Sequence, residues 1–155
     1  MLSRTLLVKA VLAYSVHEHQ AGHARCIEVW LRPDSFTVQD DGRGVGLDRD
    51  GYVESLMGLL VGRSGDVQLH GVGLSLIAAS TPRLEVESSR SGGLWRQSFA
   101  WGVANEPALR EPVEPRTGTR ITFIGPASSD SEFVEVAGQI NRWREWNPKL
   151  TIAMH

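Results

Sequence analysis

Residues 36–47, FTVQDDGRGVGL, place two adjacent carboxylates directly before a set of alternating glycines. The first half alternates apolar and polar residues as a half-buried strand does, and the glycines then predict a turn. The pattern therefore predicts a strand that delivers an acid, Asp40, into a backbone turn. Its neighbour Asp41 is expected to be solvated or to form the turn. Taken alone, the Asp-x-Gly-x-Gly pattern is also typical of an ordinary turn or of a calcium-binding loop.

A second glycine motif lies in residues 69–80, LHGVGLSLIAAS. Gly71 and Gly73 precede a run of small and apolar residues that predicts a helix. The first turn of a helix leaves backbone N–H groups unpaired at the positive end of the helix dipole, and such groups bind anions. The motif therefore predicts a phosphate site. By itself it also fits a close contact between a helix and a sheet.

The rest of the sequence supplies elements that could position these motifs. Apolar periodicity and glycine stops predict helices over residues 3–20, 52–60, 71–80 and 131–144, and the first of these is expected to be amphipathic. Alternation predicts strands over residues 26–31, 36–39, 83–88, 94–101, 120–124 and 150–152. Strands and helices do not alternate strictly. We therefore expect an α+β fold, a two-layer sandwich in which helices pack on one face of a mixed sheet.

Length and composition limit the classes of protein to consider. The 155 residues suit one domain, residues 1–155. The net charge of -2 and the pI of about 6.2 make direct nucleic-acid binding an unexpected function. The apolar start is too short to span a bilayer, so no membrane partner is expected and the predicted location is cytoplasmic. Cys26 lies in a predicted strand and is expected to be a buried, inert core residue.

The two glycine motifs, in this order, resemble the GHKL ATPase superfamily, which includes gyrase, heat-shock chaperones, histidine kinases and MutL. Residues 95–102 (WRQSFAWG) and 117–123 (TGTRITF) also resemble gyrase-type segments. The resemblance runs from about residue 6 to residue 152 and is strongest to the ATP-binding domain of gyrase B. It implies the Bergerat fold, which is an α+β sandwich.

The resemblance also implies how an adenine nucleotide, ATP or ADP, would be bound. In the family, the aspartate that matches Asp40 accepts a hydrogen bond from the adenine amino group, usually with a bridging water. The threonine that matches Thr119 shares that water. Gly42 and Gly44 would let the main chain approach the base and adopt angles that a β-carbon forbids.

Arginines complete the implied site. Arg43 matches an arginine that pairs with a glutamate of the first helix, here Glu18, and lies over the adenine. Arg96 matches an arginine at the pocket rim, and for both arginines a solvent-exposed role is the alternative. The implied phosphate site is the helix start formed by His70, Gly71, Val72 and Gly73.

The first helix lacks the residues that would hydrolyse ATP. Hydrolysing members of the family carry a glutamate that activates water and, one turn later, an asparagine that holds magnesium. In the gyrase register these positions are Ala10 and Tyr14, and in a MutL-like register they are Ala13 and His17. Loss of a general base removes about 10²–10⁴ in rate, so efficient hydrolysis and a need for Mg²⁺ are not expected. Glu18 is an alternative base, although an ion pair is its favoured use.

Two groups of residues leave further alternatives. His17, His19 and His23 raise the possibility of a metal site, but no further ligand completes a set, and none is expected. Trp143 and Trp146 could present an aromatic patch to a partner, although packing of the last helix on the sheet is favoured.

Three functions follow from these observations. The predicted one is a nucleotide-binding domain without efficient hydrolysis, with a regulatory or subunit role and a protein partner of unknown identity. The second is an ATPase or kinase-like enzyme completed by a partner, and the third is a protein-interaction module that has lost nucleotide binding. The residues implied to bind adenine are all present, which argues against the third function. The missing glutamate and asparagine of the first helix argue against the second.

Overall fold

The computed structural model describes residues 4–44, 81–90, 93–101, 103, 109–111, 117–125 and 129–155. The elements within these residues are α1 (Arg4–Gln20), β1 (Cys26–Leu31), β2 (Ser35–Asp40), β3 (Arg83–Arg90), β4 (Gly93–Phe99), β5 (Leu109–Glu111), β6 (Gly118–Ile124), α4 (Glu132–Trp146) and β7 (Thr151–Met154). The helices expected over residues 52–60 and 71–80 lie outside the described residues.

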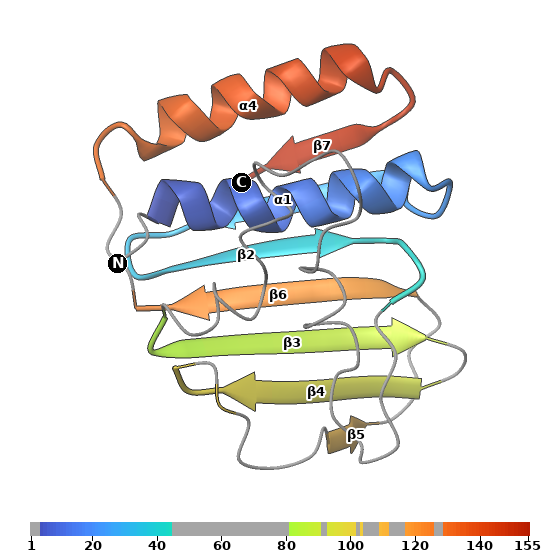
Figure 1. Cartoon of the computed structure of the whole chain (residues 1–155), viewed down its shortest axis with the longest axis vertical. Coiled ribbons are helices and arrows are strands. Elements are labelled where there is room, and N and C mark those ends of the chain that lie inside the picture. The colour runs from blue at the N-terminus through green and yellow to red at the C-terminus, as the bar shows by residue number, and fades with distance from the viewer. Residues whose placement is uncertain are drawn as a thin grey trace.

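The strands form one seven-stranded sheet in the order β5-β4-β3-β6-β2-β1-β7. Strands β1 and β7 pair in parallel, and the other neighbours are antiparallel. Both described helices lie on the same side of this sheet, with α1 running along the strands and α4 beside the β7 edge (Figure 1). The predicted α+β sandwich with a mixed sheet is therefore confirmed. Strand β5 is an addition, because the sequence pattern indicated no strand there.

The core lies between the sheet and α1. Alternate residues of the central strands are buried and apolar, and the largest of these side chains are Phe36, Phe123, Ile27, Leu84 and Ile121. The rings of Phe36 and Phe123 stack with centroids 4.5 Å apart. The prediction of an amphipathic first helix is wrong, because α1 is buried on nearly all sides. It contacts both β2 and α4, so more than one of its faces packs against protein.

A buried ion pair fastens the beginning of α1. The Arg4 guanidinium donates to the carbonyl oxygens of Pro33 at 3.1 Å and Ser35 at 2.8 Å, in the turn between β1 and β2. Its Nε lies 3.1 Å from Glu132 Oε1 at the start of α4, and both side chains are almost fully buried. The same guanidinium lies over the Phe36 ring. Arg4 therefore joins α1, the hairpin and α4 at one end of the sheet.

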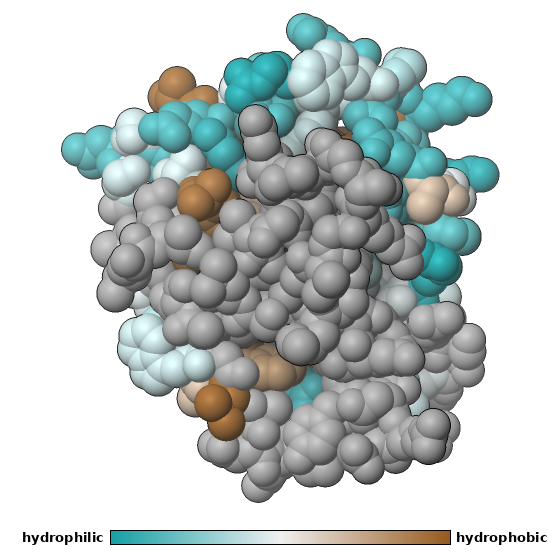
Figure 2. All heavy atoms as spheres, viewed as in Figure 1, coloured by the Kyte–Doolittle hydropathy of each residue, from teal (hydrophilic) through white to brown (hydrophobic). Residues whose placement is uncertain are grey.

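Two expectations about buried and exposed residues can be compared with the structure. Cys26 is exposed rather than buried, because the alternation of β1 turns Ile27 and Val29 toward the helices and leaves Cys26 on the opposite face. Trp143 is buried, as packing of the last helix requires, whereas Trp146 is 69% exposed. The surface over α4 is otherwise mostly hydrophilic (Figure 2). Neither described helix is long and apolar enough to cross a membrane.

Candidate functional site

Asp40 ends β2 with its carboxylate inside the protein. The strand alternates so that Phe36, Val38 and Asp40 all face α1, and Asp40 is only 3% exposed. Ser15 Oγ donates to Asp40 Oδ2 at 2.7 Å. The backbone N–H groups of Gly42 and Thr119 donate to Oδ1 at 2.9 and 3.3 Å. The predicted delivery of an acid into a turn is therefore present, and the acid is buried with three donors around it.

Glycines make this arrangement possible because the main chain runs close to Asp40. Gly118 has φ +139°, and a β-carbon there would collide with the Asp40 carbonyl oxygen. A β-carbon at Gly42 would lie 2.5 Å from Glu18 Cγ, and a β-carbon at Gly44, which has φ +79°, would lie 2.5 Å from the Ser89 carbonyl oxygen. These glycines let the Asp40 loop pack under α1 and against β3.

Burial raises the pKa of Asp40 to about 6. The hydrogen bonds from Ser15, Gly42 and Thr119 oppose this shift, and the negative charge of Glu18 adds to it. Desolvation disfavours the charged form of a carboxyl group, whereas donated hydrogen bonds favour it. At neutral pH Asp40 is therefore mostly an ionised acceptor, held in a place where ionisation is unfavourable.

The Thr119 hydroxyl lies beside Asp40 and is unusual for a buried group. Its Oγ1 has no hydrogen-bond partner among the described residues, and such a group costs about 1–3 kcal/mol when left unpaired. The Thr119 side chain lies close enough to the Tyr14 hydroxyl to lower the pKa of Tyr14 in part. Burial, and then the negative charge of Asp40, raise the pKa of Tyr14 above its usual value. Tyr14 is therefore a neutral phenol beside a carboxylate.

Arg43 and Glu18 form the predicted ion pair. Arg43 Nε lies 2.8 Å from Glu18 Oε1, and its Nη2 donates to Oε2 at 3.1 Å. Glu18 is buried, while half of the Arg43 side chain is exposed. Burial opposes ionisation of Glu18, but the bonds from Arg43 outweigh it and hold the pKa of Glu18 below its usual value. Both carboxylate oxygens of Glu18 are therefore engaged.

This chain is similar in sequence to DNA gyrase B proteins and similar in fold to a topoisomerase domain. It is 35% identical, over 96% of its length, to the chloroplastic/mitochondrial DNA gyrase B of Oryza sativa subsp. japonica. It is 37% identical, over 78% of its length, to the DNA gyrase B of Micrococcus luteus. A solved topoisomerase IV ATP-binding domain of Francisella tularensis superposes with a TM-score of 0.77 and 26% identity, covering 96% of this chain and 79% of that one. The chain belongs to the GHKL superfamily.

The match covers a small part of the gyrase proteins themselves. The chain spans 24% of the Oryza protein and 19% of the Micrococcus protein. No family model matches the chain.

The GHKL first-helix positions can be followed on α1. Ala10, Tyr14 and Glu18 are spaced four residues apart, so they share one face of the helix. Glu18 contacts the loop after Asp40 through Gly42 and Arg43, which shows that this face is turned toward the site. The side chains on that face are thus a methyl group, a phenol and an ion-paired carboxylate. The described residues contain no group of three or more His, Cys, Asp or Glu side chains that could hold a metal ion.

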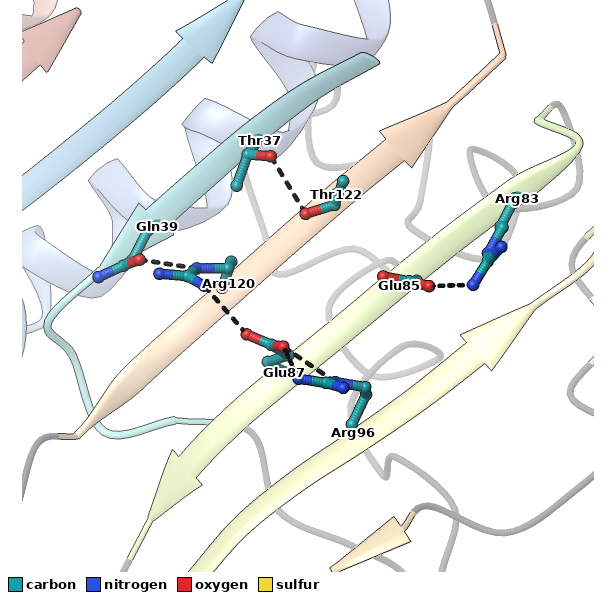
Figure 3. Close-up of polar contacts among 8 residues, drawn as sticks. All are labelled: Thr37, Gln39, Arg83, Glu85, Glu87, Arg96, Arg120 and Thr122. Atoms are coloured by element: carbon teal, nitrogen blue, oxygen red, sulfur yellow. Dashed lines mark hydrogen bonds and ion pairs between the residues drawn. The ribbon is translucent and has the colours of Figure 1, made fainter. Parts of the chain in front are cut away.

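Arg96 is not brought together with Asp40. It lies on the face of the sheet away from α1, where its Nε and Nη2 donate to Glu87 Oε1 at 2.9 and 2.6 Å (Figure 3). Arg120 lies on the same face of the sheet, where its Nε donates to Gln39 Oε1 at 2.8 Å. Arg96 is thus paired with a neighbouring strand on the open face, and its role at a pocket rim stays a prediction.

Of the other residues singled out in the sequence, the structure describes Asp41 but not the predicted helix start at residues 70–73. Asp41 is exposed, which agrees with the expected solvated role. Its Oδ1 accepts hydrogen bonds from the backbone N–H groups of Arg25 and Cys26 at 2.7 and 2.9 Å, so it joins the loop to the start of β1. The helix start at residues 70–73 lies outside the described residues.

Two residues of the site were not anticipated from the sequence. Ser15 supplies the shortest hydrogen bond to Asp40, and its signal was a serine within the apolar run of the first helix. Gly118 lets β6 pass against the Asp40 main chain. Its signal was a glycine placed between two threonines directly before a strand.

Proposed function

We propose that this chain is an adenine-nucleotide-binding domain that binds ATP or ADP without efficient hydrolysis. The observation that carries the proposal is the buried, three-donor Asp40 carboxylate next to a buried Thr119 hydroxyl with no described partner. The gyrase and topoisomerase relatives support it, because one of them is named as an ATP-binding domain.

The chemistry of this pair suits adenine. An ionised carboxylate accepts hydrogen bonds and cannot donate them, so it favours the exocyclic amino group of adenine. A carbonyl oxygen at the same place, as in guanine, would face the carboxylate acceptor to acceptor. The Thr119 hydroxyl can donate or accept, which suits a bridging water beside a ring nitrogen. Asp40, Thr119 and the main chain at Gly42 and Gly44 would therefore read the base, with Arg43 at its edge.

The charged tail needs a second site. The helix start at His70, Gly71, Val72 and Gly73 would offer backbone N–H groups and a positive dipole end to the phosphates. Arg96 would approach the ligand only from the rim.

The face of α1 explains why hydrolysis would be slow. Ala10 offers no group to take a proton, and Tyr14 is a neutral phenol. Glu18 has both oxygens bonded to Arg43 and a lowered pKa, so it is a weak base for water. Oxygen ligands from carboxylates or amides, which Mg²⁺ prefers, are not offered by the first two positions. Binding would therefore be insensitive to magnesium, and the role would be regulatory or that of a component in a larger assembly with a protein partner.

Isothermal titration calorimetry with ATP, ADP and a non-hydrolysable analogue, with and without Mg²⁺, tests this function. We expect micromolar-to-millimolar binding in all cases. Asp40→Asn should weaken binding by at least about 10–100-fold, since hydrogen bonds to charged groups contribute about 1.5–3 kcal/mol. Asp41→Asn, at the adjacent exposed carboxylate, is the matched control and should bind like the wild type. Equal affinity of the Asp40 variant would refute the assigned pocket, and steady phosphate release by the wild type would refute the absence of hydrolysis.

A further inference from the structure

A second hollow lies at the end of the molecule where α1 and α4 begin and where β1 turns into β2 (Figure 1). Its volume is about 240 Å³, which is below the range of about 300–1,000 Å³ for pockets that take drug-sized ligands. The residues that line it are all distinct from those around Asp40. The hollow therefore limits a ligand to roughly the size of a free amino acid.

One residue that lines the hollow is a buried carboxylate with an unused oxygen. Glu132 is 2% exposed, and its Oε1 lies 3.1 Å from Arg4 Nε. Its Oε2 has no hydrogen-bond partner among the described residues. A buried carboxylate oxygen without a donor is unfavourable, because nothing replaces the water that it has lost. Glu132 therefore favours a ligand that brings a donor, above all a positively charged one.

A cation lines the same hollow. Arg32 is exposed, and its guanidinium has no ion pair among the described residues. The Arg4 guanidinium, which pairs with Glu132, also donates to the Arg32 carbonyl oxygen. Glu132 and the Arg32 main chain are therefore separated by a single guanidinium group. Because the planar guanidinium of arginine matches a carboxylate in shape and charge, Arg32 favours a carboxylate on the ligand.

The hollow also has apolar lining, from Leu31, Pro33 and Phe133. Phe133 is 61% exposed, although it is a large aromatic side chain. Covering such a ring with the apolar part of a ligand removes both surfaces from water, which is favourable. The hollow thus combines an unpaired acceptor, an unpaired cation and an apolar surface.

We propose that this hollow binds a small zwitterionic ligand of the α-amino-acid class with an apolar side chain. The ammonium group of the ligand pairs with Glu132, its carboxylate pairs with Arg32, and its side chain packs against Leu31, Pro33 and Phe133. A ligand with only an apolar group or only a carboxylate leaves Glu132 without a donor, whereas an amino acid matches all three features. The site is separate from Asp40, so the proposal does not depend on nucleotide binding.

NMR titration of the ¹⁵N-labelled whole chain with L-leucine, and separately with L-phenylalanine, tests the site. We expect saturable binding of at least one of them, with the largest amide shifts at residues 31–33 and 129–133. N-Acetylleucine lacks the ammonium group and leucinamide lacks the carboxylate. Each analogue should bind about tenfold or more weakly than its parent, because a hydrogen bond to a charged group is lost.

Four variants test the protein side of the same contacts. Arg32→Ala should weaken leucine binding by about tenfold and leave leucinamide binding unchanged, since that ligand has no carboxylate to lose. Arg25→Ala, at an exposed arginine outside the hollow, is its matched control. Phe133→Ala should weaken binding several-fold, whereas Val134→Ala, at the adjacent side chain that is 71% exposed and does not line the hollow, should bind like the wild type. All four side chains are exposed, so these substitutions should leave the fold intact.

Three results would overturn the proposal. The first is the absence of saturable binding by both amino acids. The second is equal binding of leucine and of the neutral N-acetylleucinamide, which would show that the hollow takes an apolar side chain of a peptide instead of a free amino acid. The third is equal weakening by Arg32→Ala and Arg25→Ala, which would show general attraction by surface charge. The nucleotide titrations with Asp40→Asn are decided separately from all three.

Discussion

Asp40→Asn should stabilise the protein at neutral pH while it weakens nucleotide binding. Burial raises the pKa of Asp40 from 3.8 to about 6, a difference of about two units. Each unit corresponds to 1.36 kcal/mol, so keeping this carboxylate ionised costs about 3 kcal/mol of folding free energy above pH 6. Asparagine has nearly the same shape and does not ionise. The variant therefore avoids that cost.

The sign of the pH dependence follows from proton binding. Between pH 6 and pH 3.8 the folded state binds more protons at Asp40 than the unfolded state does, so wild-type stability from this group rises as the pH falls. The excess stability of Asp40→Asn over the wild type should therefore shrink by about 2–3 kcal/mol between pH 8 and pH 4. Taking the difference between the two proteins cancels every group that they share.

Urea unfolding followed by tryptophan fluorescence at pH 8, 7, 6, 5 and 4 measures this difference. Ser15→Ala is the companion variant. It removes the side-chain hydrogen bond that lowers the pKa of Asp40, so its own pH dependence should be steeper than that of the wild type. A difference between Asp40→Asn and the wild type that stays constant with pH, or that grows toward acid, would refute the reasoning.

Three further predictions concern the Arg4–Glu132 ion pair, the missing catalytic groups and the ligand. Arg4→Met strands the buried Glu132 carboxylate and should cost about 3–5 kcal/mol; adding Glu132→Gln should restore part of this loss in urea titrations, and additive effects would contradict the pairing. The double substitution Ala10→Glu with Tyr14→Asn should raise Mg²⁺-dependent phosphate release by about 10²-fold or more, and an unchanged rate despite bound nucleotide would count against the assigned register. Nucleotide affinity, measured by calorimetry at pH 5 and pH 7, should fall as Asp40 is protonated below pH 6; an affinity independent of pH would disagree with an ionised acceptor.

The fold could be predicted to the extent that local patterns determine it. Alternation predicted the strands over residues 26–31 and 36–39, because the face of each side chain is set by its own strand. The glycine and the acid at the end of β2 predicted the position of the site. The helical face carrying Glu18 and the pairing of Arg43 came from the family resemblance, and the structure confirms that ion pair.

Features that depend on distant packing could not be predicted. The periodicity of α1 could not reveal that α4 would bury a further side of it. Cys26 looked like a core residue because the polarity of its strand did not say which face would meet the helices. Thr119 lies next to Asp40 because β6 pairs with β2, and no local pattern around either residue indicates that pairing.

The pairing of β2 with β6 has a consequence for how this domain can evolve. Asp40 and Thr119 are adjacent although they are 79 residues apart along the chain, and the ladder Val38–Ile121 fixes their register. Insertions or deletions between them can therefore accumulate while the sheet keeps the two residues in place.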